Sequence, residues 1–230
     1  MRKTFHGELD HIGRTLVEMT AAVDVAMRDA TTALLDADLT LAEKVISGDA
    51  EVDRLRDDLE ARAFDLLARQ QPVAVDLRTL VTSLKAVADL ERMGDLALHV
   101  AKVARMRYPS CAVPDEVRDT IADMGEVAQR IVTKTRQVLE GQDVELAVEL
   151  ERDDDKMDAL HRTLFSLLLS DDWEHGVEPA IDITLIGRYY ERYADHAVSV
   201  ARQTIYLVTG ELPPPPASLH AGAPETALGV

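Results

Sequence analysis

The stretch Glu91-Arg92-Met93-Gly94-Asp95 decides the fold, because it returns 100 residues later as Glu191-Arg192-Tyr193-Ala194-Asp195. Upstream of each copy, a second set of residues recurs at an offset of 105: Asp38, Leu41, Ala42, Val45, Asp49, Asp53, Leu55 and Leu59 match Asp143, Leu146, Ala147, Leu150, Asp154, Asp158, Leu160 and Leu164. The offset changes by five residues where a loop is expected, and loops tolerate such changes of length. The sequence therefore predicts two copies of one structural unit.

Each copy has the pattern of long helices. Apolar residues recur every three or four positions, as in Leu9, Ile12, Leu16 and Met19, and β-branched residues form no alternating runs. A capping box at 40–43 is expected to open the second helix, and prolines 72, 109, 114 and 179 separate the apolar stripes. We predict an all-α fold of two tandem three-helix bundles, with the first in residues 1–108, a linker at 109–114, the second in 115–210, and a disordered proline-rich tail at 211–230.

The charge balance narrows the classes of function. The chain has 230 residues, with 42 acids against 25 bases and a net charge of -17. Nucleic acids and anionic membrane surfaces need a basic footprint, so we expect no nucleic-acid partner. One cysteine, the lack of a signal-peptide pattern and the lack of an apolar run of about 18 residues predict a cytoplasmic protein without direct membrane insertion.

Pairs of acids spaced i,i+4 recur at equivalent places in both halves, and this spacing puts both carboxylates on one helix face. About eight such pairs are expected by chance in so acidic a chain. Recurrence of both pairs is therefore the informative observation. The candidate metal ligands are Asp49, Asp53, Glu91, Asp95, Asp154, Asp158, Glu191 and Asp195.

Carboxylates that converge from two helices need neutralisation. A cation that prefers oxygen ligands, such as Mg, Ca, Mn or Fe, would supply it, and so would arginine partners. Arg92 and Arg192 are adjacent to the glutamates, so we expect them to point about 100° away around the helix. A metal cluster and an arginine-paired or solvated acidic face both stay open. The histidines His99 and His196 are lesser candidates for such a site, and Trp173 is expected to fix its loop to the end of the bundle, with a partner contact as the alternative.

The two motifs resemble those of the PhoU family of phosphate-uptake regulators, in particular its actinobacterial branch. The resemblance covers about residues 4–210, and Ala194 stands where the family commonly has glycine. It implies a non-enzymatic cytoplasmic homodimer that represses phosphate-starvation signalling through contacts with a sensor histidine kinase and with the ATPase subunit of a phosphate ABC transporter. It also implies a multinuclear metal on the paired acids, Fe or Zn, with Mg or Mn as further candidates. The alternative function is a carboxylate-bridged metalloenzyme, an oxidase or a phosphohydrolase. No nucleophile–base motif supports that alternative.

Overall fold

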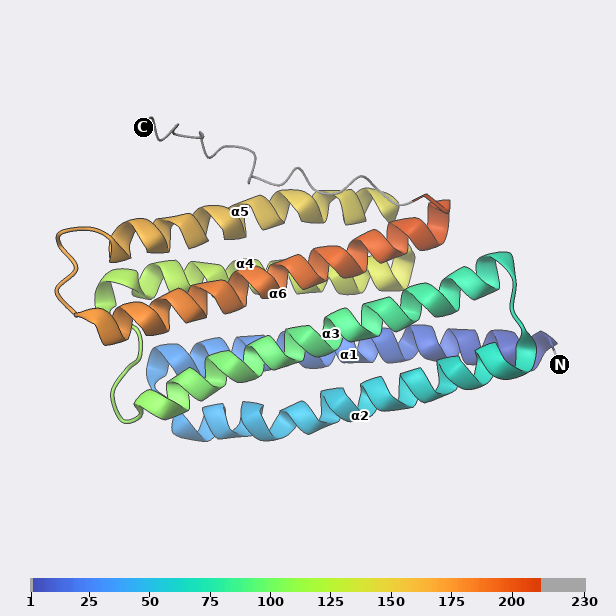
Figure 1. The fold of residues 1–230 in the computed structure, drawn as a ribbon, viewed down its shortest axis with the longest axis horizontal. Helices are drawn as coiled ribbons and strands as arrows, with labels where there is room; N and C mark the ends of the chain where they lie inside the picture. Colours follow the sequence, from blue (N-terminus) through green and yellow to red (C-terminus); the bar gives the residue numbers. More distant parts are fainter. Residues whose placement is uncertain (1, 212–230) are drawn as a thin grey trace, which may run out of the picture.

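The computed structural model describes residues 2–211, and over this range the chain forms six helices and no strand. They are α1 (Arg2–Asp36), α2 (Leu39–Gln70), α3 (Ala74–Arg107), α4 (Asp115–Gly141), α5 (Val144–Leu168) and α6 (Val177–Thr209). All run along the long axis of the molecule, with α1–α3 on one side and α4–α6 on the other (Figure 1). The predicted fold class is confirmed. The predicted tail at 211–230 lies outside the described residues beyond Glu211.

The same turn opens the second helix of each half. Ala37 and Gln142 both adopt left-handed φ angles, of 51° and 52°, and each precedes an aspartate that caps the next helix. Asp38 accepts a hydrogen bond from the backbone N–H of Leu41, and Asp143 accepts from two such groups at the start of α5. The expected capping box at 40–43 is therefore wrong, because the helix already starts at residue 39.

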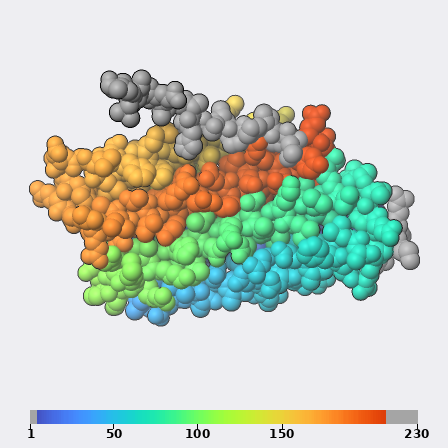
Figure 2. Space-filling model, viewed as in Figure 1, coloured from blue at the N-terminus to red at the C-terminus, as the bar shows by residue number. Residues whose placement is uncertain are grey.

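One continuous core joins the two halves. Helix α1 packs against α4, and α3 packs against α6, while α2 and α5 lie on the outside of their own halves. Gly125 of α4 allows the close approach to α1, because a Cβ atom there would lie 2.7 Å from the Thr31 methyl carbon. The Thr31 hydroxyl is 2.6 Å from the hydroxyl of the fully buried Tyr190. The space-filling view shows the resulting elongated body (Figure 2).

Polar side chains add to this junction between α3 and α6. Asp89 lies 2.9 Å from His196 Nδ1 and accepts a hydrogen bond of 2.7 Å from Ser199. His99 stacks on Tyr189, with ring centroids 5.3 Å apart. The two histidines therefore tie the halves together here, and within the described residues neither forms a hydrogen bond or ion pair with one of the paired acids.

Candidate acidic sites

Each half brings its two acidic pairs together between its second and third helices. In the first half, Asp49 and Asp53 lie on α2 and face Glu91 and Asp95 on α3. Burial raises the pKa of Asp49, and the nearby charges of Asp95 and Asp53 raise it further. Gly94 permits this close packing, since a Cβ atom there would lie 3.2 Å from Val52 and 3.5 Å from Asp49 Oδ1. The four carboxylates expected as metal ligands in the first half therefore lie near one another at the seam of α2 and α3.

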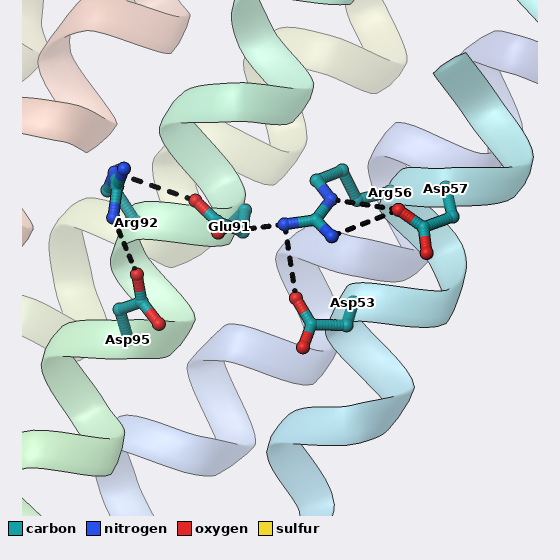
Figure 3. A network of polar contacts seen from close by, with 6 residues as sticks. All are labelled: Asp53, Arg56, Asp57, Glu91, Arg92 and Asp95. Atoms are coloured by element: carbon teal, nitrogen blue, oxygen red, sulfur yellow. Dashed lines mark hydrogen bonds and ion pairs between the residues drawn. The ribbon is translucent and has the colours of Figure 1, made fainter. Parts of the chain in front are cut away.

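An arginine of α2 bridges acids of both helices at the first cluster. Nη1 of Arg56 lies 3.2 Å from Asp53 Oδ1 and 2.9 Å from Glu91 Oε1, and Nη2 lies 2.9 Å from Asp57 Oδ1 (Figure 3). This guanidinium spans α2 and α3 and neutralises carboxylates from both helices. Sequence reasoning missed Arg56, although its position one turn after Asp53 was the available signal.

The expectation that Arg92 points away from the acids is wrong. Nη1 of Arg92 is 2.9 Å from Asp95 Oδ2, and its Nε is 3.6 Å from Glu91 Oε2 (Figure 3). The long arginine side chain lies along the helix surface and reaches the acid three residues later. The expected angle of about 100° describes only the directions in which successive side chains leave the helix. The first cluster therefore contains two guanidinium groups among its carboxylates.

The second cluster has the same acids with a different charge environment. Asp154 and Asp158 lie on α5, and Glu191 and Asp195 lie on α6. Burial, and after it the charges of Asp195, Asp158 and Glu191, together raise the pKa of Asp154 to about 7. The Oδ1 atom of Asp154 is buried and has no hydrogen-bond partner in the described part of the chain. Burial is also the main cause of the raised pKa of Glu191 and of Asp195.

The cations of the second cluster are arranged differently from those of the first. At the offset of 105 residues, His161 stands where the first half has Arg56. Burial lowers the pKa of His161, and Arg188 lowers it further. Its Nε2 atom is buried without a hydrogen-bond partner among residues 2–211. Arg188 on α6 pairs with Glu191, and Arg162 is only within 3.9 Å of Asp158. The second cluster thus keeps a buried carboxylate oxygen that no cation of the described residues contacts.

The donor set of these clusters suits a metal ion that prefers oxygen ligands. The uncontacted Asp154 oxygen is the observation that fits such an ion, because an isolated buried carboxylate is costly. In their present rotamers, however, no three Asp, Glu, His or Cys side chains within residues 2–211 are arranged to hold one ion. Metal binding would require the carboxylates to turn toward one another.

Comparison with known proteins relates the whole described chain to one group of relatives. The family model described as "PhoU domain" matches residues 16–104 and 121–204. The phosphate-specific transport system accessory protein PhoU homolog 2 of Mycobacterium tuberculosis is 48% identical over 213 residues, which cover 93% of this chain and 100% of that protein. The PhoU homolog of Rhizobium meliloti is 30% identical over 211 residues, which cover 91% of this chain and 89% of that protein.

Solved structures give the same fold. The crystal structure of PhoU from Pseudomonas aeruginosa superposes with a TM-score of 0.80 at 29% identity, over 90% of this chain and 100% of that one. The phosphate transport system regulatory protein PhoU from Streptococcus pneumoniae has a TM-score of 0.81 at 22% identity, over 91% and 99% of the two chains, and shows the fold alone. No helix in the described residues is both long and apolar enough to span a membrane.

Proposed function

Because this chain belongs to the PhoU family, we propose that it is a non-catalytic regulator of phosphate transport in the cytoplasm. It represses phosphate uptake and phosphate-starvation signalling when phosphate is plentiful. It does so as a homodimer that contacts a sensor histidine kinase and the ATPase subunit of a phosphate ABC transporter. The observation that carries this proposal is the full-length match to accessory proteins of phosphate transport.

The surface of the molecule supports a role in binding proteins. Acidic clusters lie along the α2–α3 and α5–α6 seams, and the chain carries a net charge of -17. Such a field steers association with basic protein surfaces and weakens as salt rises.

A deletion strain tests the regulatory role. Removal of this gene and all its paralogues should raise expression of phosphate-uptake genes in phosphate-rich medium, and a wild-type copy should restore repression. Expression that stays low and phosphate-responsive in the deletion strain would contradict the proposal. Turnover of phosphoesters or dioxygen by purified, metal-loaded protein would instead favour the metalloenzyme.

We also propose that the paired acids bind a metal ion and that the two clusters are unequal in this respect. The second cluster, of Asp154, Asp158, Glu191 and Asp195, is the stronger site, because one of its buried oxygens contacts no cation. In the first cluster, Arg56 competes with a metal for carboxylates of both helices, Asp53 and Glu91, whereas Arg188 of the second cluster pairs with Glu191 on its own helix. The ion is Fe or Zn, with Mg and Mn as the other candidates that suit oxygen ligands.

Metal analysis of matched variants tests this inequality. Protein purified without chelator should lose most of its bound metal when Glu191 and Asp195 become Gln and Asn. The same changes at Glu91 and Asp95 should remove much less. Equal losses would contradict the inequality, and negligible metal in wild-type protein under all loading conditions would remove the metal proposal altogether.

A further inference from the structure

An apolar groove lies at the end of the second half, between α5, α6 and the loop that joins them. It has a volume of about 540 Å³. Its lining is almost entirely apolar and comprises Phe165, Leu168, Leu169, Trp173, Ile181 and Leu185, among others. Leu169 is 83% exposed and Ile181 is 54% exposed, so large apolar side chains face solvent beside the groove. Exposed apolar surface gathered in this way is typical of a binding site for another macromolecule.

Trp173 is held in place at one wall of the groove. Its indole N–H donates a hydrogen bond of 2.9 Å to the carbonyl of Gly176, and its ring lies edge-on to His175. The side chain is partly buried against the core. The polar atom of the ring is therefore satisfied within the loop, and the ring is available for apolar contact. A tryptophan fixed in this way is a common anchor of protein interfaces. The expectation that Trp173 fixes its loop fits this arrangement, and a partner contact adds to it.

The charge around the groove identifies the kind of partner. Residues 163–187 contain no lysine or arginine and five acids, which are Asp171, Asp172, Glu174, Glu178 and Asp182. Arg107 of α3 pairs with Glu178 and Asp182. Asp171, Asp172 and Glu174 are exposed on the loop beside the groove. The corresponding segment of the first half, residues 58–87, balances four acids with four bases. The acidic rim is thus a property of the second half alone.

We propose that this groove binds an amphipathic helix of a partner protein, with apolar side chains in the groove and lysine or arginine beside the 171–174 loop. Apolar faces of helices commonly bind in grooves of this kind. A second copy bound groove to groove would bring two sets of the exposed loop acids Asp171, Asp172 and Glu174 together, and such like-charge contact opposes association. The inference names a docking surface for the partner binding proposed above and rests on that function.

The test uses an 18-residue peptide designed as a helix, with leucines on one face, lysines on the other and no tryptophan. Trp173 is the single tryptophan of the chain, so its emission reports binding at the groove directly. We expect a saturable blue shift, since the ring leaves solvent. I181D should weaken binding at least tenfold, and L169S should weaken it too. The matched change V81D, 100 residues earlier in the first half, should leave affinity unchanged.

The charge requirement has its own controls. The triple variant D171N/D172N/E174Q should bind the peptide more weakly and with a flatter salt dependence. A peptide with glutamate in place of lysine should not bind. Equal binding of a peptide with serine in place of leucine would show that charge alone acts and would overturn the groove proposal.

Other outcomes also decide the proposal. An equal loss of affinity in V81D and I181D would overturn it, as would unchanged binding in both I181D and L169S. The wild type could also self-associate through the groove. If I181D abolishes that self-association and the peptide does not displace it, the occupant is a second copy of this chain, and the proposal is overturned. Circular dichroism of each variant confirms that it is folded. The regulatory role is tested separately. A deletion strain that still represses phosphate-uptake genes would contradict that role, but it would not change the binding of the peptide to the groove.

Discussion

The replacement of Asp154 by asparagine should stabilise the metal-free protein at neutral and alkaline pH. Asp154 has a buried oxygen without a hydrogen-bond partner and lies near three other carboxylates of the second cluster. Its charged form is therefore unfavourable in the folded protein. Asparagine has nearly the same shape and carries no charge, so it removes the repulsion while it preserves the packing.

The size of the effect follows from the pKa of Asp154. Its ordinary value of 3.8 applies to the unfolded chain, and burial with neighbouring charges raises the pKa to about 7 in the folded state. That difference corresponds to about 4 kcal/mol as an upper limit. The side chain is only partly buried, and solvent screens part of the repulsion. We therefore expect a gain of about 1–2 kcal/mol.

The gain should depend on pH in one direction. Below the unfolded pKa, Asp154 is protonated in both states and the variant gains nothing. Between the unfolded and folded pKa values, the unfolded state loses its proton first, so wild-type stability falls as pH rises. Above the folded pKa of about 7 the whole penalty is present. The gain should therefore be small near pH 4 and complete at pH 8.

Urea unfolding of both proteins in the presence of a chelator measures this gain at each pH. Asp155→Asn is the matched control, since Asp155 is exposed and adjacent in sequence, and its charge makes the smallest contribution among those that raise the pKa of Asp154, so its effect should be much smaller than that of Asp154→Asn. A gain at pH 8 no larger than the gain at pH 4, or a loss of stability at pH 8, would refute the reasoning.

Three further changes test the packing and charge of the fold by thermal or urea unfolding. Gly125→Ala should destabilise the junction of the halves by about 1–3 kcal/mol, because its Cβ would overlap the Thr31 methyl group, and Thr31→Ser should relieve that loss. Arg56→Gln should cost about 1 kcal/mol, since it leaves the largely buried Glu91 without its partner from α2. Asp143→Ala should cost about 0.5–2 kcal/mol through loss of the cap of α5.

Each of these has a result that would contradict it. Unchanged stability in Gly125→Ala would mean that α1 and α4 separate without cost. A more stable Arg56→Gln protein would show that the guanidinium does not neutralise the first cluster. If Asp143→Ser lowers stability as much as Asp143→Ala, the hydrogen bonds of the cap are not the cause, since serine caps helices about as well as aspartate.

The sequence by itself determined the helices, the repeat and the grouping of the acids. The spacing of apolar residues along a helix determines which face of that helix is apolar. The i,i+4 spacing of Glu91 and Asp95 likewise places both carboxylates on the same face of their helix. These are local properties of one helix, and they depend little on the rest of the fold. The recurrence of whole motifs at offsets of 100 and 105 residues then gave the tandem arrangement.

Only the tertiary structure decided what neutralises the acids. Arg56 reaches Glu91 because α2 and α3 pack side by side, while His161 at the equivalent position leaves an oxygen of Asp154 without a partner. It also decided that the halves share one core through α1, α3, α4 and α6. Both results depend on distances between residues far apart in sequence. Spacing along one helix cannot supply them, because a long charged side chain takes its partner from whichever neighbouring helix the packing brings within reach.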